Sequence, residues 1–434
     1  MNTENVNKKE KIAIIGAGIS GLLSAYLLNR EHDVTLFEAG SYLGGHTHTK
    51  LVKSGDKTYP VNTGFIVFND WTYPNFIKLM DQIGVKSEDS DMSFSVRDEN
   101  TGLEYNGTSF NSLFAQRRNI FKPSFWFMIK DILRFNKQTV EMLASDSIPE
   151  QQTLGDFVKE HGYNERFVNH YLVPMGASIW SASVDVMMDF PIRFFLRFFS
   201  NHGMLSVDDR PQWRVISDGA ESYIEPLIKS FKDNIHLNSP VSSVKREGDG
   251  NGNGNGNGIV LTTFSGEEQH FDQVIFACHS NQALAILDKP TQQENEILGA
   301  IPYQDNEVVL HTDRRLMPKR KLAWAAWNYH IPQRLSEFAM VTYHMNTLQN
   351  FDDAPDDFMV TLNRTAEIAP GKIIDKYNYA HPVFTMDGIA AQQRHSEISD
   401  KNSTHFCGAY WFNGFHEDGV NSALRVAKAF GIEL

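Results

Sequence analysis

Three glycines near the start of the chain, Gly16, Gly18 and Gly21, have the spacing G-x-G-x-x-G. An apolar run of strand type precedes them and one of helical type follows. In such a unit the first glycine permits a tight turn, the second lets a pyrophosphate approach the backbone, and the third lets helix and strand pack closely. The helix N-terminus offers N–H groups to the phosphates. Glu38 follows about 20 residues later, where a carboxylate accepts bonds from ribose hydroxyls. The segment predicts a dinucleotide site without distinguishing FAD from NAD.

The composition is that of a globular protein with sizeable cores. The chain has 434 residues, enough for two or three domains, and 41% of them are hydrophobic. The net charge of -13 argues against nucleic acid as a partner. Cys278 and Cys407 give no disulfide framework, and a reducing cytoplasm fits them. His46 and His48 have no acidic or cysteine cluster nearby, so no metal site is expected. No apolar run is long enough for a signal-peptide core or a membrane span.

A glycine pair and a glycine-containing strand extend the first motif. The pair at residues 44–45 follows Glu38 and precedes His46, and a strand-like run at residues 61–68 contains Gly64. In this order the features resemble the opening of the FAD-dependent amine oxidase and phytoene desaturase superfamily. Members of that superfamily usually carry Arg where this chain has His46.

The end of the chain resembles the closing motif of the same superfamily. A last strand-like run reaches Gly408, and Gly414 leads into a helix that begins within residues 415–419. In the superfamily this helix points its N-terminus at the flavin, where negative charge develops on reduction. The two ends together favour FAD, because an NAD enzyme needs no such second site. Cys407 does not match the cysteine that links flavin covalently in some members, so the resemblance implies non-covalent FAD.

The resemblance also assigns an adenine contact to the backbone of Val241. The expected cofactor-binding residues are Gly16, Gly18, Ile19, Ser20, Gly21, Glu38, Ala39, Gly44, Gly45, His46, Thr63, Gly64, Phe65, Val241, Gly408, Gly414, Phe415, His416, Glu417, Asp418 and Gly419.

The expected fold class is α/β, with a Rossmann-like FAD-binding domain of the amine oxidase type and an inserted α+β substrate domain. An Asn-Gly tract at residues 251–258 predicts a flexible hairpin loop, because both residue types tolerate positive φ, and we assign it no function. The expected FAD-binding domain comprises residues 1–70, 213–300 and 401–434, and the expected substrate or cap domain comprises residues 71–212 and 301–400.

A basic segment of the cap domain, residues 116–143, is predicted to be helical. Its apolar residues fall near one face, namely Trp126, Ile129, Leu133, Val140 and Leu143, with Phe125, Met128 and Ile132 beside it. Its basic residues are Arg117, Arg118, Lys122, Lys130, Arg134 and Lys137. Two interpretations remain open. The segment is either an interfacial helix that docks on anionic lipid or a cap helix with a solvated charged face.

Aromatic residues recur at helical spacing in residues 194–199, either as core or as the wall of a tunnel for a long apolar substrate. The substrate-lining candidates are Trp180, Phe195, Phe199, Trp324 and Trp327. Hydride transfer to flavin N5 needs little more than a C–H held at about 3–3.5 Å in a dry site. Desaturation needs one base as well, for which His202, Tyr329 and His381 are candidates, although each could equally be a hydrogen-bonded structural residue. No lysine within residues 301–400 matches the one that amine oxidases often hold near N5.

Nearly the whole chain resembles one bacterial branch of amine-oxidase-like flavoproteins, often encoded beside cyclopropane-fatty-acid-synthase-like methyltransferases. The matching segments are residues 46–49, 62–69, 310–313, 327–329 and 414–419. Part of that branch is linked to the desaturation of methylated fatty acyl chains. The resemblance therefore implies an apolar or lipid substrate and a methyltransferase partner.

We therefore expect an FAD-dependent oxidoreductase that desaturates a methylated fatty acyl chain. The alternatives are a flavin amine oxidase, a flavin-dependent double-bond isomerase and, from another class, an FAD-stabilised lipid-binding partner of a methyltransferase. The expected location is the cytoplasm, at the inner face of the membrane if the basic helix docks there. The sequence leaves open the electron acceptor, the oligomeric state and whether the substrate is a free acid, a phospholipid or an amine.

Overall fold

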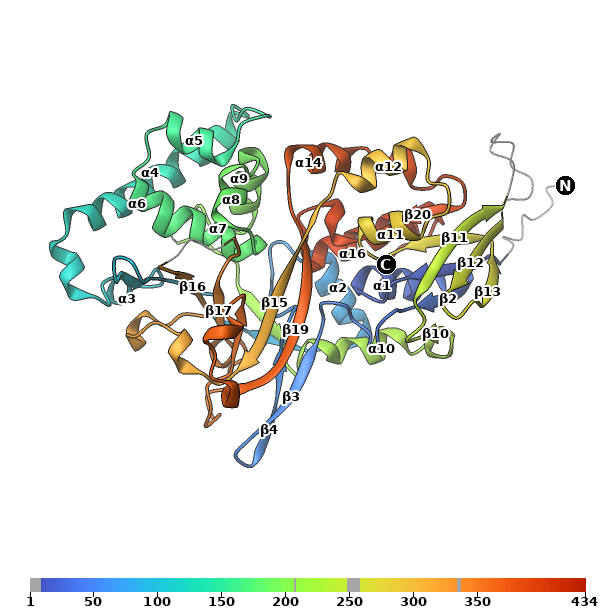
Figure 1. Ribbon diagram of the computed structural model, residues 1–434, viewed down its shortest axis with the longest axis horizontal. Coiled ribbons are helices and arrows are strands. Elements are labelled where there is room, and N and C mark those ends of the chain that lie inside the picture. Colours follow the sequence, from blue (N-terminus) through green and yellow to red (C-terminus); the bar gives the residue numbers. More distant parts are fainter. Residues whose placement is uncertain (1–8, 207, 248–257, 334–336) are drawn as a thin grey trace.

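The computed structural model describes residues 9–206, 208–247, 258–333 and 337–434. A parallel five-stranded sheet, in the order β10-β2-β1-β14-β20, gathers strands from distant parts of the chain. Figure 1 shows helices α1 and α16 side by side against this sheet. The elements are β1 (Lys11–Ile15), β2 (Asp33–Phe37), β10 (Ile235–His236), β14 (Gln273–Phe276), β20 (Thr404–Phe406), α1 (Ile19–Leu28) and α16 (His416–Ala429).

Both faces of β1 are buried, which explains its unbroken apolar run. Ile12 and Ile14 pack with residues of α1 and α16, whereas Ala13 and Ile15 pack on the other face. That other face is covered by an antiparallel sheet of β11 (Val241–Glu247), β12 (Gly258–Thr263) and β13 (Glu268–Phe271). The Asn-Gly tract expected between β11 and β12 lies outside the described residues, apart from Gly258.

A seven-stranded sheet, in the order β19-β15-β18-β17-β16-β7-β8, forms the second large layer of the molecule (Figure 1). Its pairings are antiparallel except for that of β16 with β7. The strands are β7 (Phe94–Asp98), β8 (Glu104–Asn106), β15 (Tyr303–His311), β16 (Trp327–Ile331), β17 (Val341–His344), β18 (Met359–Leu362) and β19 (Ile373–Pro382).

Helices pack against this sheet around an aromatic core that they share with β7, β8, β16 and β17. They are α3 (Phe110–Leu113), α4 (Pro123–Ala144), α5 (Leu154–Glu160), α6 (Glu165–Phe167), α7 (Val173–Trp180), α8 (Val184–Met188) and α9 (Ile192–Asn201). The other elements are β3 (Thr49–Ser54), β4 (Lys57–Asn62), β5 (Phe68–Asn69), β6 (Ser87–Asp89), β9 (Trp213–Ile216), α2 (Pro74–Ile83), α10 (Ile224–Ile228), α11 (Ser280–Ile286), α12 (Gln292–Gly299), α13 (Met345–Leu348), α14 (Met386–Gln393) and α15 (His395–Ile398).

The structure shows how the apolar residues of α4 are divided between the core and the solvent. The helix buries Phe125, Met128 and Phe135 in the cap core. Of the apolar face described in the sequence, Leu133 is 54% and Val140 47% exposed, whereas Ile129 and Leu143 are half-buried against this core. Periodicity could not choose between these faces because both carry apolar residues at helical spacing.

The division into two domains stays a prediction. One small sheet links segments on both sides of the predicted boundaries, because β9 pairs with β5 and with β6. None of the described helices combines the length and the hydropathy needed to cross a lipid bilayer.

Candidate active site

The glycine-rich turn after β1 leaves open space beside Gly18. Gly16 has a φ of +103°, and its N–H donates to the Phe37 carbonyl over 2.8 Å. A Cβ placed on Gly21 would lie 1.9 Å from the Gly16 carbonyl oxygen, so helix and turn touch there. A Cβ on Gly18 would meet no atom within 4 Å. Gly18 is also the N-cap of α1 and provides no capping side chain, so a ligand can reach the helix N-terminus.

Glu38 and the glycine pair complete this end of the site. The Glu38 carboxylate accepts hydrogen bonds from the N–H groups of Ala17, at 2.8 Å, and Gly40, at 2.7 Å. A carboxylate has lone pairs to accept further bonds. Gly44 donates its N–H to the Ala17 carbonyl over 2.8 Å, and a Cβ on Gly45 would lie 3.2 Å from the Gly18 Cα. The pair therefore lies directly against the glycine-rich turn.

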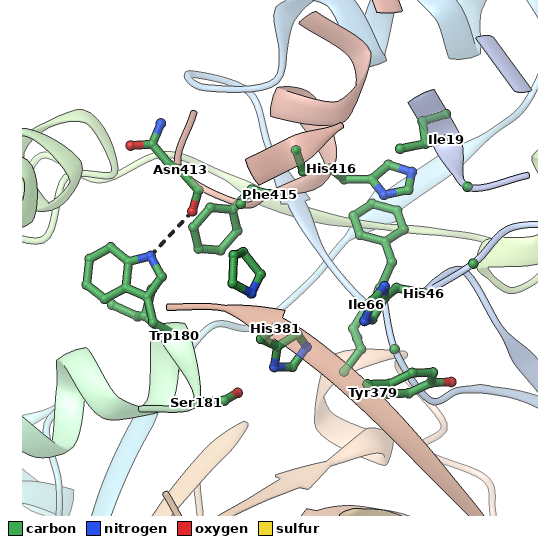
Figure 2. Close-up of a pocket in the computed structure, with 18 of the residues that line it drawn as sticks. Ile19, His46, Ile66, Trp180, Ser181, Tyr379, His381, Asn413, Phe415 and His416 are labelled. Carbon is green, nitrogen blue, oxygen red and sulfur yellow. Dashed lines mark hydrogen bonds between the residues drawn. The ribbon is translucent and has the colours of Figure 1, made fainter. Parts of the chain in front are cut away.

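A cavity of about 1120 Å³ runs from this turn into the cap. It exceeds the roughly 300–1,000 Å³ of ordinary small-molecule sites, so a dinucleotide and a substrate can share it. Figure 2 shows part of its wall. The expected cofactor residues that line the cavity are Gly16, Gly18, Ile19, Ser20, Glu38, Ala39, Gly44, Gly45, His46, Thr63, Gly64, Phe65, Val241, Gly408, Gly414, Phe415 and His416.

Four expected cofactor residues do not line this cavity. Gly21 is the packing contact described above. Gly419 lets α16 approach α1, because a Cβ there would lie 2.7 Å from a methyl carbon of Ile19. Asp418 accepts the Phe415 N–H at the start of α16 over 2.9 Å. Gly21, Gly419 and Asp418 therefore support the packing and the start of the helices next to the cavity without lining it.

Glu417, the fourth, caps another helix. Its two oxygens accept the N–H groups of Asn75, at 3.0 Å, and Phe76, at 2.8 Å, in the first turn of α2. No side chain at the N-cap of α2 does so. Burial raises the pKa of Glu417 from 4.5 to about 7, although these hydrogen bonds act in the opposite direction.

Replacing Glu417 by Gln is expected to change how stability depends on pH. A raised carboxyl pKa means that the folded protein holds the proton more tightly than the unfolded chain. Glu417 therefore lowers the unfolding free energy as pH rises from 4.5 to about 7. The E417Q protein lacks this loss, so its stability relative to wild type improves across that window. Urea unfolding at several pH values measures the unfolding free energy of both proteins. The control is E165Q, because Glu165 is an exposed residue of α6. Parallel pH curves for E417Q and wild type would contradict the assignment.

His381, one of the three expected bases, lines the cavity and faces it as a hydrogen-bond donor. Its ring lies 5.3 Å from that of His46, centroid to centroid, and burial lowers its pKa to about 3 (Figure 2). The side-chain oxygen of Asn306 accepts from Asn363, so its NH₂ group faces His381 Nδ1 at 3.2 Å. The neutral ring consequently carries its proton on Nε2.

His46 sits between the glycine pair and His381. Burial lowers its pKa to about 4, opposed by a hydrogen bond to the Ala380 backbone. Its Nε2 has no hydrogen-bond partner among the described residues. The neighbouring His279 also has a pKa lowered to about 4 by burial. This side of the cavity thus carries neutral imidazoles where a charged arginine is usual for the superfamily.

The other two expected bases have structural roles. His202 lines the cavity, but its Nδ1 donates to the Phe198 carbonyl at 2.9 Å and its Nε2 lies 3.2 Å from the Thr72 hydroxyl. Tyr329 is 6% exposed within the cap core and does not line the cavity.

Two of the five substrate-lining candidates, Trp180 and Trp327, do line the cavity. Phe195 and Phe199 were wrong, because they stack on each other at 4.0 Å inside the cap core. Trp324 was wrong as well, since its indole N–H donates to the Pro318 carbonyl away from the cavity.

Sequence reasoning missed most of the cap side of the wall. The missed residues include Phe94, Tyr105, Tyr171, Met175, Ile179, Arg210 and Tyr343. On α9, only Phe198 faces the cavity, which a helical wheel could have shown once the core face was known. Arg210 is exposed, and among the described residues it is the one Lys or Arg in the wall.

The wall fits the FAD expected from the sequence. The open space at Gly18 admits a pyrophosphate, and Glu38 is placed for a ribose.

Of the two cysteines, Cys278 lines the cavity and Cys407 is fully buried, with its sulfur 3.9 Å from the Ser24 hydroxyl. Burial raises the pKa of both thiols to about 12, so both are protonated at neutral pH.

Comparisons with known proteins agree with this fit. A family model described as flavin containing amine oxidoreductase matches residues 19–361. The cyclohexylamine oxidase of Brevibacterium oxydans IH-35A superposes with a TM-score of 0.68 at 14% identity, over 98% of this chain and 100% of that one. A CLA-producing fatty acid isomerase from P. acnes gives a TM-score of 0.68 at 16% identity, over 98% and 99%. At these identities the likeness establishes the shared α/β fold.

Two curated relatives match parts of the chain. Tryptophan 2-monooxygenase of Allorhizobium ampelinum is 39% identical over 106 residues, which are 24% of this chain and 14% of that protein. L-amino-acid oxidase of Siganus canaliculatus is 23% identical over 331 residues, which are 71% of this chain and 58% of that protein. The chain thus spans less than two thirds of the length of either relative.

Proposed function

The chain belongs to the family of flavin-containing amine oxidoreductases, and we propose that this FAD-dependent oxidoreductase desaturates a fatty acyl chain. The observation that carries the proposal is the chemistry of the cap side of the cavity. Apolar and aromatic side chains such as Met175, Ile179 and Phe198 line this side of the cavity. The charged side chains in the same part of the wall, Asp91, Arg210 and Asp305, are all exposed to solvent. A long hydrocarbon chain gains most from such a wall.

Arg210 adds a reason to favour a substrate with an anionic head. Burial raises the pKa of the Tyr171 phenol, also in the wall, and the nearby positive charge of Arg210 partly opposes that rise. A carboxylate or phosphate would pair with the guanidinium at the rim while the chain extends inward. Two exposed carboxylates, those of Asp91 and Asp305, also line the cavity, so the preference for an anionic head rests on the position of Arg210 beside Tyr171.

The residues of this chain position the substrate and keep the site dry. FAD, when bound, supplies the acceptor for a hydride. The aromatic wall excludes water from the bond that reacts, and Trp180 is fixed by an indole hydrogen bond to the Asn413 carbonyl at 3.4 Å (Figure 2). The neighbouring carbon must also lose a proton, and the imidazoles of His46 and His279, neutral at pH 7, are the groups we propose for it.

Oxidation of an amine is the second candidate function. The family itself favours it, as do the relatives named for amine and amino-acid oxidation. Aromatic rings cluster where an amine could sit, with Phe198 4.8 Å from Phe415 and 4.8 Å from Trp180. No lysine lines the cavity among the described residues.

The test is an anaerobic absorbance titration of the purified yellow protein. A methylated long-chain fatty acid, a phospholipid that carries the same chain and a simple amine are added separately. We expect the acyl substrates, and not the amine, to bleach the flavin band. R210E is expected to raise the half-saturating concentration of the free acid about tenfold. R197E, on an exposed arginine of α9 outside the cavity wall, is the matched control.

Other outcomes separate the alternatives. Bleaching by the amine alone would transfer the assignment to amine oxidation. Product in which a double bond has moved, without net bleaching, would indicate an isomerase. Bleaching by the free acid that is equal in R210E and wild type would remove the head-group role of Arg210 and leave desaturation standing.

A further inference from the structure

One end of the cap exposes an unusual concentration of apolar side chains. Among the described residues, fifteen large apolar side chains are exposed, and seven of them belong to α3, α4 and the 3₁₀ helix Arg117–Phe121 between them. Scattered exposed apolar residues are normal, but clusters mark interaction surfaces. The seven are Phe110 (69% exposed), Ile120 (39%), Phe121 (85%), Trp126 (42%), Phe127 (56%), Leu133 (54%) and Val140 (47%).

The local structure holds this apolar tip in place. Arg117 donates to the carbonyls of Asn111, at 3.0 Å, and Phe114, at 2.8 Å, which ties the 3₁₀ helix to α3. The Trp126 indole donates to the Ile120 carbonyl at 2.8 Å. The aromatic residues are therefore presented on a braced surface, at the end of the molecule opposite β1 and β2 (Figure 1).

Basic side chains surround the apolar residues. Residues 107–145 contain six Lys and Arg but only two Asp and Glu, in a chain whose net charge is -13. Arg134 pairs with Asp131 at 3.1 Å. Among the described residues, no ion pair joins Arg117, Arg118, Lys122, Lys130 or Lys137 to a carboxylate.

A second chain segment extends the basic surface. Helix α3 packs against the 3₁₀ helix Lys321–Ala323. Lys319, Arg320 and Lys321 are exposed there, and Leu322 is 40% exposed beside them. Two stretches some 200 residues apart in the sequence thus present the same mixture of cations and apolar groups on one surface. Their meeting is a property of the fold, because the composition of one stretch does not determine that of the other.

We propose that this docking face, made of α3, residues 117–140 and residues 319–322, binds the surface of an anionic lipid bilayer. The rings of Phe121 and Phe127 would enter the boundary between headgroups and acyl chains, and Lys122 and Lys130 would pair with lipid phosphates. Stripes of apolar residues separated by lysines, as in Trp126, Lys130 and Leu133, suit an interface where long cationic side chains reach the headgroups.

The docking face also adjoins an opening of the cavity. Gly107 and Thr108 line the cavity, are exposed, and lead directly into α3. The Tyr105 hydroxyl donates to the His170 carbonyl at 2.6 Å, next to Tyr171, the wall residue influenced by Arg210. A lipid drawn from a bilayer at this face would have a short path to the cavity. The docking itself does not depend on which substrate the enzyme oxidises.

The test is sedimentation of the full-length holoprotein with vesicles. Phosphatidylcholine vesicles are compared with vesicles containing equal parts of phosphatidylcholine and phosphatidylglycerol, at low and high salt. We expect binding to the anionic vesicles that weakens with salt. The variant F121S/F127S and the variant K122E/K130E are each expected to lower the partition coefficient about tenfold or more.

The matched control is F264S/K53E. Phe264 is 73% exposed and Lys53 is also exposed, but both lie outside the docking face. Unchanged flavin absorbance and melting temperature establish that each variant is folded, as expected for changes outside the core, since Lys122 is half-buried and the other changed residues are exposed. Equal sedimentation of the wild type with both kinds of vesicle, or equal loss in the control, would overturn the proposal. Because the readout is binding, its failure would leave the proposed oxidoreductase function untouched.

Discussion

Replacing Gly18 by Val is expected to yield a folded protein that has lost FAD. The backbone at Gly18, with φ of -70° and ψ of 177°, is open to any residue, and a Cβ there meets no protein atom within 4 Å. The added side chain would instead occupy the space into which a pyrophosphate must fit. Overpacking of about 1–3 kcal/mol corresponds to a roughly 5- to 150-fold weaker affinity for FAD. Flavin absorbance per mole of purified protein, followed by titration of the apoprotein with FAD, measures the loss.

The matched control for this variant is Gly371→Val. Gly371 likewise has no atom within 4 Å of an added Cβ and no positive φ, but it lies outside the cavity wall. It should retain wild-type flavin content and circular dichroism. If G18V purified with a full complement of tightly held flavin, the pyrophosphate could not lie against this turn.

Replacing Gly21 by Ala is expected to destabilise the whole protein, although it adds a single methyl group. The new Cβ would lie 1.9 Å from the Gly16 carbonyl oxygen and 3.1 Å from the Ala277 Cβ. The first neighbour is backbone of the turn itself and cannot rotate away. We expect the unfolding free energy to fall by more than about 3 kcal/mol, measured by urea unfolding of the apoprotein and by its melting temperature.

Gly299→Ala is the control for a glycine in a helix. Its added Cβ would make an ordinary contact of 3.9 Å with Leu284, so the variant should be neutral or stabilised by up to about 1 kcal/mol. An unchanged melting temperature for G21A would mean that helix and turn are not packed as the structure has them. Substitutions at two glycines of one motif thus have different expected effects. G18V loses affinity for FAD, whereas G21A loses stability of the fold.

The dinucleotide end of the site could be predicted from sequence because its function is carried by backbone. Gly16 and Gly18 act through a turn and an absent side chain, and those properties follow from residue type and spacing alone. Glu38 follows at a distance that a single strand–helix–strand unit dictates. The family model and the α/β fold agree with the expectation drawn from these residues.

The cap could not be predicted in the same way, because packing decides which side of each helix is buried. On α9, Phe195 and Phe198 are the same residue type three positions apart, and only the second reaches the cavity. On α4, apolar residues lie on more than one face, and the face that is buried in the core carries Phe125 and Phe135. Periodicity states that a face exists, but the neighbouring elements decide which one is covered.

The chemistry of His381 depended on still more distant partners. Its proton lies on Nε2 because Asn306 is oriented by Asn363, the residue that follows β18, and no spacing in the sequence carries that information. Local geometry is fixed by covalent connection over a few residues, so the sequence by itself determined the nucleotide-binding turn, its acid and the family. Hydrogen-bond direction, burial and the shape of the substrate wall arise between segments that are far apart in the sequence, so only the tertiary structure decided them.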